Sequence, residues 1–180
     1  MHLGLERGKT ELLAHEKEWE SEAKKTIRIL QKLIPEARDI QHVGSTAIKS
    51  IYAKPIVDIA VALDDVQSVT SHIDELAVCG IIYRGSDVPE QILFIIGEGD
   101  IRTHHIHIVK WRGKAWDNYI MFRDYMNSHP EKAAEYEKLK KQLASSFPDD
   151  RRTYTEGKAE YIEKIITEAR GTSEHIASDV

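Results

Sequence analysis

The sequence contains very little cysteine: Cys79 is the one thiol in 180 residues. A lone cysteine excludes an internal disulfide and a zinc site built from several cysteines. Its neighbours Ala77, Val78 and Ile81 are apolar, so we expect Cys79 to be a packed thiol.

Long apolar runs and long basic runs are also missing. No uninterrupted apolar stretch approaches the roughly 18 residues of a membrane span, and residues 1–13 lack the apolar core of a signal peptide. We therefore expect a soluble, cytoplasmic protein with no membrane partner. The net charge of -5 is mild, and without a run of lysine and arginine it does not indicate a nucleic-acid-binding face.

A length of 180 residues suits one domain with a sizeable core. We expect residues 1–180 to form that domain, with a helical C-terminal part at about 114–170. In this part Pro130 starts one helix, and Thr153 or Thr155 caps the last one before a loose polar tail that begins at Gly171. The sequence does not determine the oligomeric state, and a homo-oligomer is one of the alternatives.

Apolar periodicity in the first 110 residues predicts a mixed sheet with helices. Trp19 begins an apolar stripe at helical spacing, so we expect an amphipathic helix with Trp19 in the core. A second helix is expected at residues 66–77, ended by Gly80. Strands joined by short loops must be antiparallel, and their combination with one crossover helix indicates an α+β fold. The expected strands are residues 40–43, 56–63, 81–84, 91–96 and 101–110.

A glycine-serine turn follows the first of these strands and is suited to binding a phosphate. Gly44 allows a tight backbone turn, and the hydroxyls of Ser45 and Thr46 can cap a helical turn through residues 47–51. The free N–H groups and the positive dipole end of such a helix form an anion site. Lys54 is close to this turn in the sequence and is placed to neutralise a bound phosphate.

Asp58 is the one charged residue in the apolar strand at residues 56–63. Because side chains alternate along a strand, Asp58 shares a face with Ala60 and Ala62, while larger apolar residues face the other way. Burying an unpaired carboxylate is unfavourable. We therefore expect Asp58 to have a chemical role.

The strand at residues 101–110 carries the other candidate chemistry, in the segment RTHHIHIVK. Alternation places His105 and His107 on one face, while His104 faces solvent or a helix. Two imidazoles at positions i and i+2 can share a metal, or one of them can act as a general base near neutral pH. Alternatively, they form hydrogen bonds in a polar pocket that binds no metal.

A Gly-Ser turn, a short helix and an aspartate on the next strand resemble the nucleotidyltransferase fold, in which the turn holds nucleotide phosphates and strand carboxylates hold a divalent metal. More specifically, the segments HVGSTA, AKPIVDI, HHIHIV, FRDYM and YTEGKAEYI, in that order, resemble the GrpB family of bacterial proteins, also called UPF0157. This match covers most of the chain. Four residues lie in segments that match the family and would complete a phosphate site if they reach the turn. They are Arg123, Lys140, Tyr154 and Lys158.

In the nucleotidyltransferase fold, a later strand supplies a third carboxylate beside an Asp-x-Asp or Asp-x-Glu pair. By this fold analogy, Asp58, His105 and His107 would form a cluster of two histidines and one carboxylate. Such a cluster suits zinc, manganese or iron more than the all-oxygen magnesium site of ordinary transferases. The second position of the pair is Ala60 in this chain, so the usual metal clamp is incomplete and a one-metal variant is expected.

Two functions use this site, and a third does not. The first is an enzyme that moves a nucleotidyl or phosphoryl group of a nucleotide or another phosphorylated small molecule. The second is a non-catalytic module that binds a nucleotide or coenzyme, and the resemblance links it to coenzyme A metabolism because similar domains are fused to dephospho-coenzyme A kinase. The third is a protein-interaction or folding-accessory role of the helical part. We favour the enzyme, because a buried Asp58 and paired histidines are unfavourable in a purely structural domain.

Overall fold

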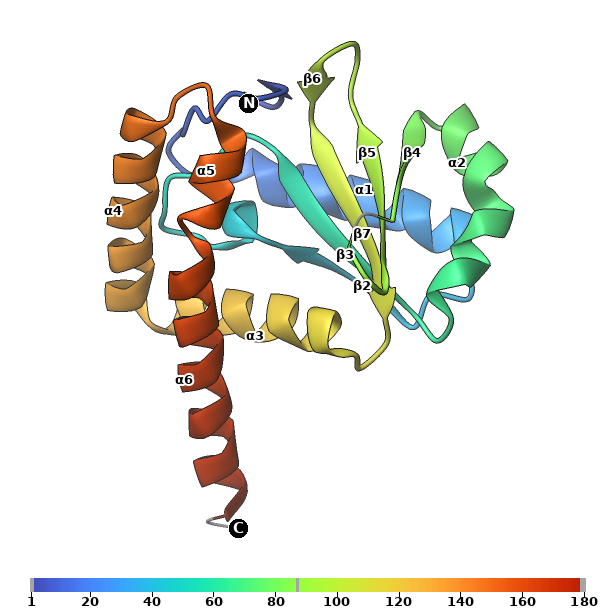
Figure 1. Ribbon diagram of the computed structural model, residues 1–180. Coiled ribbons are helices and arrows are strands. Elements are labelled where there is room, and N and C mark those ends of the chain that lie inside the picture. Colours follow the sequence, from blue (N-terminus) through green and yellow to red (C-terminus); the bar gives the residue numbers. More distant parts are fainter. Residues whose placement is uncertain (1, 87, 179–180) are drawn as a thin grey trace.

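The computed structural model, which describes residues 2–86 and 88–178, has a mixed β-sheet with helices on both faces (Figure 1). Its strand order is β2-β3-β7-β5-β4, with β3 and β7 parallel and the other neighbours antiparallel. This confirms the expected α+β class. The strands of this sheet are β2 (Asp39–Val43), β3 (Val57–Leu63), β4 (Ile81–Gly85), β5 (Gln91–Ile96) and β7 (His104–Lys110), and a separate short pair joins β1 (Leu5–Glu6) to β6 (Ile101–Arg102). The helices are α1 (Glu18–Leu33), η1 (Ser45–Ala47), η2 (Val66–His72), α2 (Ile73–Val78), α3 (Lys114–Ser128), α4 (Pro130–Ser146), α5 (Arg151–Glu156) and α6 (Ala159–Ser178).

One face of the sheet packs against α1 and forms the main core. Val57 of β3 and Ile106 of β7 point to this side and lie in one apolar cluster with Trp19. Trp19 is 0% exposed, which confirms that it belongs to the core. His104 is also buried on this side, where its Nε2 lies 3.2 Å from Thr26 Oγ1 of α1, so it faces a helix.

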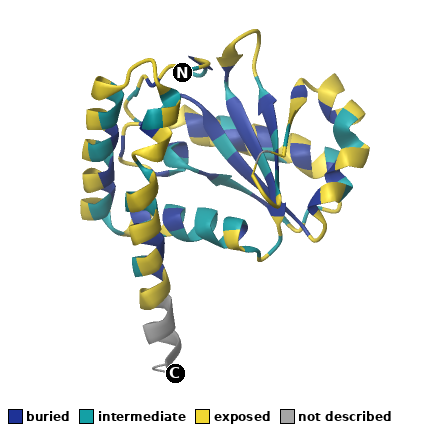
Figure 2. Ribbon diagram, viewed as in Figure 1, coloured by how far each residue is buried: buried dark blue, intermediate teal, exposed yellow. Residues whose placement is uncertain are grey.

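The opposite face carries Asp58 and is covered by the C-terminal helices. Ala60 and Ala62 of β3 pack with Trp116 of α3, as alternation along β3 predicts. α3, α4 and α6 share a further apolar cluster, and their outer surfaces are exposed (Figure 2). Among the described helices, none combines the length and the apolar character that crossing a membrane requires.

Two of the expected helices differ from the sequence pattern, one in length and one in continuity. The turn expected at residues 47–51 is helical only in η1, a single 3-10 turn, and is followed by Ile48 in an extended conformation. Ile48 and Ile51 are both buried against α3, α4 and α6, so their spacing reflects burial and not a helix. Three residues align too few peptides to provide a helix dipole, so the helix expected at residues 47–51 is wrong, while phosphate binding at the Gly44 turn stays a prediction. The helix at 66–77 is divided into η2 and α2, and the valine, serine and threonine residues of η2 disfavour an α-helix.

The end of the chain also differs from expectation. Asp150 caps α5, because its Oδ1 accepts a hydrogen bond from the backbone N–H of Thr153 at 3.0 Å. The last helix, which Thr153 or Thr155 was predicted to cap, is α6 and begins at Ala159; both threonines lie inside α5, so that prediction is wrong. α6 continues past Gly171, where no proline interrupts it, so the expected loose tail is helical, and residues 179–180 lie outside the described chain.

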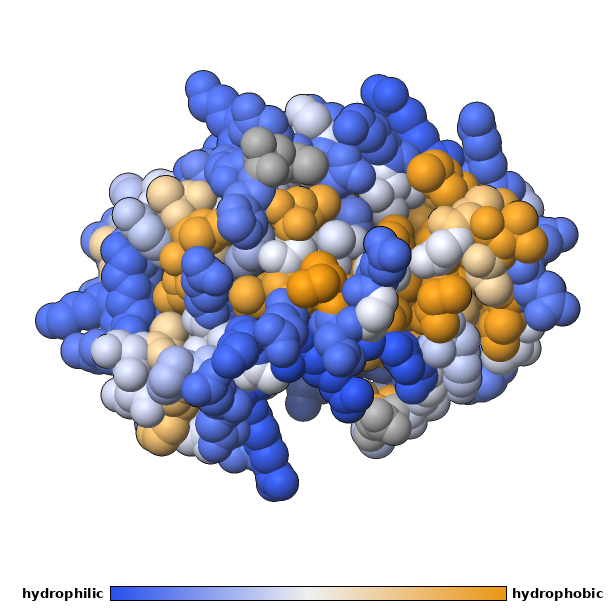
Figure 3. Space-filling model, turned by 90° about the horizontal axis from the view of Figure 1, so that it is seen from above, coloured by the Kyte–Doolittle hydropathy of each residue, from blue (hydrophilic) through white to orange (hydrophobic). Residues whose placement is uncertain are grey.

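Cys79 is exposed, which corrects the expectation of a packed thiol. It follows the short helix α2, in which Leu76 is the buried residue and Val78 is 89% exposed. Apolar neighbours in the sequence therefore do not enclose the thiol. Exposed apolar residues of this region include Ile82 and Val88, and Figure 3 shows hydrophobic residues gathering on the right, the side of α2 and β4 in Figure 1.

Candidate functional site

Asp58, His105 and His107 meet on the sheet face opposite α1. In the parallel pairing of β3 with β7, Asp58 lies opposite His105, and Ala60 lies opposite His107. Asp58 Oδ1 is 3.1 Å from His105 Nδ1 and 3.3 Å from His107 Nε2. Because the two histidines alternate to the same face of one strand, a single carboxylate oxygen reaches both rings. The structure thus brings together the three side chains that the sequence places on one face.

The spacing of these three groups fits a metal ion. One donor atom from each residue lies within 4.8 Å of the other two. Ligands that bind zinc at about 2.0–2.1 Å are separated by roughly 2.8–3.0 Å when they are neighbours in an octahedron and by roughly 3.3–3.4 Å in a tetrahedron, so distances between about 2.8 and 3.4 Å suit a metal. The two distances from Asp58 fall in this range. Ala60, which lies opposite His107, has no donor atom to add. The cluster therefore supplies one oxygen and two nitrogens, a donor set that suits zinc, manganese or iron.

Hydrogen bonds set the charge of the cluster. Arg151 Nη2 lies 3.4 Å from His105 Nε2. A guanidinium only donates, so Nε2 accepts, and the other ring nitrogen of His105 carries the proton that it donates to Asp58. Burial alone would raise the pKa of Asp58, but the hydrogen bonds from His105 and His107 outweigh burial and hold this pKa well below its usual range. Asp58 is therefore ionised at neutral pH, the form that attracts a cation.

Position 44 requires glycine because the backbone there lies close to Asp58. Its backbone has φ 70° and ψ -167°, a region that is almost restricted to glycine. A Cβ at this position would lie 2.6 Å from Asp58 Oδ2 and 2.9 Å from Asp58 Cβ. The end of β2 therefore approaches the carboxylate closely only because residue 44 has no side chain.

A cavity of about 490 Å³ opens at this cluster and is lined by Asp58, both histidines, Gly44 and Ser45. Three cations also line it: Lys54, Arg151 and Lys158. Burial, together with repulsion from Lys158 and Arg151, lowers the pKa of Lys54 to about 7. Burial, with repulsion from Arg151, lowers the pKa of Lys158 to about 8.

The two lysines lie on one aromatic ring. Lys54 Nζ is 5.1 Å and Lys158 Nζ is 4.4 Å from the centroid of the Tyr154 ring. This ring stabilises both ammonium groups through its π face. Among the residues that the structure describes, neither lysine forms an ion pair with a carboxylate. The cation end of the cavity therefore lacks a directly paired carboxylate, and the charge of Asp58 offsets its positive charge only in part.

Neutral and apolar side chains complete the cavity. Tyr119 donates a hydrogen bond to Gln91 Oε1 at 3.3 Å, and its ring centroid is 5.2 Å from that of His107. Phe122 and Ile162 line the apolar wall. The cavity therefore combines a charged end with an apolar wall, which suits a ligand that carries both kinds of group.

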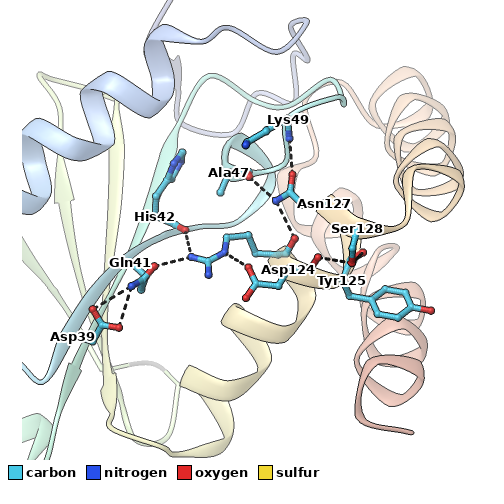
Figure 4. A network of polar contacts seen from close by, with 10 residues as sticks. Asp39, Gln41, His42, Ala47, Lys49, Asp124, Tyr125, Asn127 and Ser128 are labelled. Carbon is cyan, nitrogen blue, oxygen red and sulfur yellow. Dashed lines mark hydrogen bonds and ion pairs between the residues drawn. The ribbon is translucent and has the colours of Figure 1, made fainter. Parts of the chain in front are cut away.

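Two predicted phosphate-binding residues lie outside this cavity. Thr46 is buried with its Oγ1 2.9 Å from His42 Nε2. Arg123 Nη1 donates to Gln41 Oε1 at 2.9 Å and to the backbone oxygen of His42 at 3.0 Å, and its Nε donates to Asp124. Figure 4 shows this network around Gln41, His42 and Asp124, which joins β2 to α3. The described contacts of Arg123 are therefore structural.

Lys140 also lies outside the cavity, although its charge is near the cation end. It is 1% exposed, its Nζ donates to the backbone oxygen of Tyr52, and it lies 4.8 Å from the centroid of the Tyr136 ring. Burial, with repulsion from Lys158, lowers the pKa of Lys140 to about 7. Lys140 thus anchors the segment that precedes Lys54, while Lys54, Tyr154 and Lys158 line the cavity as the sequence analysis proposed.

Sequence reasoning missed Arg151 and the neutral residues Tyr119 and Gln91. Arg151 stands directly after Asp150, and an aspartate that caps a helix is a recognisable signal. That signal places Arg151 in the first turn of a helix but does not reveal its contact with His105. Tyr119 and Gln91 follow apolar patterns and carry no separate signal.

Comparisons with known proteins identify the family of the chain. Residues 9–168 match the family model described as GrpB protein. The glutamate-rich protein GrpB of Alkalihalophilus pseudofirmus is 36% identical over 172 residues, which cover 92% of this chain and 99% of that protein. The UPF0157 protein YqkA of Bacillus subtilis is 32% identical over 165 residues, which cover 90% of this chain but only 48% of YqkA. The chain thus spans about half the length of YqkA.

Solved structures give the same relationship. The crystal structure of the conserved protein GrpB from Enterococcus faecalis matches with a TM-score of 0.83 at 28% identity, over 91% of this chain and 99% of that one. A structure of Cid1, described as having RNA terminal uridylyl transferase activity, matches with a TM-score of 0.52 at 16% identity, over 74% of this chain and 42% of Cid1. At that identity the likeness concerns the fold alone, which is nucleotidyltransferase-like. Sequence and structure together show that the chain belongs to the GrpB family.

Proposed function

We propose that the cavity binds a nucleotide or another phosphorylated small molecule together with a divalent metal, and that the protein transfers a nucleotidyl or phosphoryl group. The observation that carries this proposal is the set of three cations at one end of the cavity. Lys54, Arg151 and Lys158 line the same space as the Asp58 cluster and form no carboxylate pair among the described residues. Partly buried cations that lie this close together are unfavourable unless an anion joins them.

The balance of charge favours phosphate over a single carboxylate ligand. Lys54, Arg151 and Lys158 contribute three positive charges when protonated, whereas Asp58 contributes one negative charge. A phosphate group offers several acceptor oxygens and more than one negative charge. Binding it would relieve the mutual repulsion that lowers the pKa of the two lysines. Arg151 would have a stronger partner in a phosphate than in the neutral ring of His105.

Asp58, His105 and His107 would hold the metal in place of the protons that the two rings donate to Asp58, and these protons would be released on binding. A divalent ion bound there supplies a Lewis acid for a phosphate oxygen or for a bound water. Ala60 leaves the site without the second carboxylate of a two-metal clamp, so we propose one metal. In the transfer, one phosphorus–oxygen bond breaks and another forms, and the protein's own part is to orient the phosphates and neutralise their charge.

The nucleotidyltransferase-like fold supports a group-transfer reaction over other uses of the cavity. Cid1 has RNA terminal uridylyl transferase activity, but the likeness to Cid1 concerns only the fold. The net charge of -5 and the cavity of about 490 Å³ favour a small molecule over RNA as the partner of this chain.

A non-catalytic binding module is the second candidate, and Ala60 is the observation that favours it. Loss of one carboxylate from a metal-binding pair reduces the number of ligands for a catalytic ion. In that case the ligand would bind to the same cations and leave unchanged. This function is compatible with a link to coenzyme A metabolism.

Thermal unfolding with single nucleotides tests the proposal. Each of the four nucleoside triphosphates and coenzyme A would be added with Mn²⁺ to the wild type and to the Lys54→Ala, Lys158→Ala and Lys49→Ala variants. A ligand present at 100 times its dissociation constant stabilises the fold by about 2.7 kcal/mol. We expect at least one ligand to stabilise the wild type and the Lys49→Ala control, because Lys49 is outside the cavity, but not the other two variants. Equal stabilisation of all four proteins would contradict binding at the cations.

Phosphorus NMR of the same mixtures separates the two candidates. Conversion of the stabilising ligand by the wild type, and its loss in Asp58→Ala, is the result expected for the enzyme. A ligand that binds for many hours and remains intact, both with water alone and with added alcohol, amine and phosphate acceptors, would identify the binding module instead.

A further inference from the structure

Residues 4–13, which we call the strap, hold both sides of Lys54. The backbone N–H of Gly4 donates to the oxygen of Pro55 at 2.8 Å. At the other end of the strap, Leu13 and Ala53 exchange two backbone hydrogen bonds, at 2.8 and 2.9 Å. The residues immediately before and after Lys54 are therefore fixed by the same segment.

The middle of the strap holds the loop that leads to Arg151. Thr10 is 1% exposed, and its Oγ1 donates to the backbone oxygens of Phe147 at 2.9 Å and Pro148 at 3.0 Å. The backbone N–H of Thr10 also donates to the oxygen of Pro148, at 3.1 Å. Asp150, two residues further on, caps the helix α5 at whose start Arg151 lies.

The cations need such a restraint. Lys54 and Arg151 come from distant parts of the sequence, and like charges in a poorly solvated cavity repel each other. Each lies at the end of a loop, where a small shift would separate them. The strap is bonded to both loops, whereas Thr10 itself does not line the cavity.

We infer that the strap is a positioning element for the anion site, in which Thr10 holds Arg151 at a fixed place relative to Lys54. The inference rests on the proposed function, because it assigns the cations to a phosphate ligand. Thr10 acts through the two loops and does not touch the ligand. The strap thus pre-organises charges that would otherwise move apart, which strengthens phosphate binding without adding a contact.

The test compares Thr10→Val with two further variants. Valine keeps the shape of threonine but removes the hydroxyl donor, and Thr10→Ser restores that donor. Thr26→Val is the matched control, because Thr26 is also a buried, hydrogen-bonded threonine but lies on the opposite face of the sheet. Binding of inorganic pyrophosphate is measured by calorimetry, and the pKa of Lys54 is measured by NMR without any ligand.

We expect pyrophosphate to bind Thr10→Val roughly threefold to tenfold more weakly than the wild type, the effect of losing the hydroxyl that Phe147 and Pro148 share. The pKa of Lys54, which burial and the neighbouring cations lower to about 7, should rise in Thr10→Val as the cations separate. Thr10→Ser and Thr26→Val should match the wild type in both measurements.

Two other outcomes are informative. Wild-type affinity and an unchanged Lys54 pKa in Thr10→Val would overturn the inference while leaving the proposed function intact. If pyrophosphate binds none of the proteins but the Lys54 pKa still rises in Thr10→Val, the positioning role is supported and the phosphate ligand is contradicted.

Discussion

Replacing Gly44 by alanine should destabilise the protein and displace Asp58. The backbone at Gly44, with φ 70° and ψ -167°, costs a residue with a side chain about 1–3 kcal/mol. The new Cβ would lie 2.6 Å from Asp58 Oδ2, so the carboxylate must move away from His105 or His107. Losing one such hydrogen bond costs roughly a further 1 kcal/mol. The sum is a loss of about 2–4 kcal/mol in the free energy of unfolding.

Gly80→Ala is the control for this prediction. Gly80 also has a positive φ, of 76°, but nothing lies within 4 Å of the position of its Cβ. The Gly80→Ala variant should therefore lose only about 1–2 kcal/mol in the free energy of unfolding, from backbone strain alone, and should bind metal as the wild type does. Urea unfolding measures both free energies, and calorimetric titration with Mn²⁺ measures the affinities. The reasoning is refuted if Gly44→Ala unfolds with the free energy of Gly80→Ala and binds Mn²⁺ as the wild type does.

Four further predictions concern charge and packing. Affinity for sulfate, whose own charge is constant in this range, should fall between pH 6 and pH 9 in calorimetry, because Lys54 and Lys158 lose their protons near their pKa values of about 7 and 8. Without ligand, the same two lysines have the opposite effect on stability, because their pKa values are lower in the folded than in the unfolded chain. Their contribution to the free energy of unfolding, measured with urea, should therefore rise with pH above about 7. A fall of this contribution would contradict the prediction. Trp19→Ala should lose about 3–5 kcal/mol in urea unfolding, since the ring is 0% exposed, and a loss below about 1 kcal/mol would argue against its core position. Arg123→Ala should lose about 1–3 kcal/mol through its broken network and leave pyrophosphate affinity unchanged, and a large loss of affinity would place Arg123 in the site after all.

The sheet and its three central residues could be predicted from the sequence because strand alternation is a fixed geometric rule. Alternation alone puts Asp58 on one face of β3, and His105 and His107 on one face of β7. It does not give the pairing of the two strands. The parallel register, which sets Asp58 opposite His105, depends on the long connection between the strands and is visible only in the structure.

The cations of the cavity could be predicted only in part. The local sequence of a helix or loop does not determine which way a side chain points in the folded protein. Lys140 lies on the face of α4 that is buried, where Tyr52 satisfies it. Arg123 turns toward β2 and not into the cavity. Arg151 reaches His105 only because a loop and a cap deliver it there. Local patterns contain no information on these long-range contacts.

Gly44 is a different case, in which the residue was recognised for an incomplete reason. The sequence indicates a tight turn, and the structure confirms a backbone that favours glycine. The closer constraint is the approach of Asp58, which is 14 positions later in the sequence. The turn pattern in the sequence therefore identified Gly44 but did not reveal that Gly44 contacts Asp58.

The most direct measurement is anomalous X-ray diffraction from crystals grown with Mn²⁺ and a nucleoside triphosphate. We predict a manganese peak between Asp58, His105 and His107, and phosphate density next to Lys54, Arg151 and Lys158. A ligand bound elsewhere, with manganese absent from the three residues, would contradict the central claim that one cavity holds both.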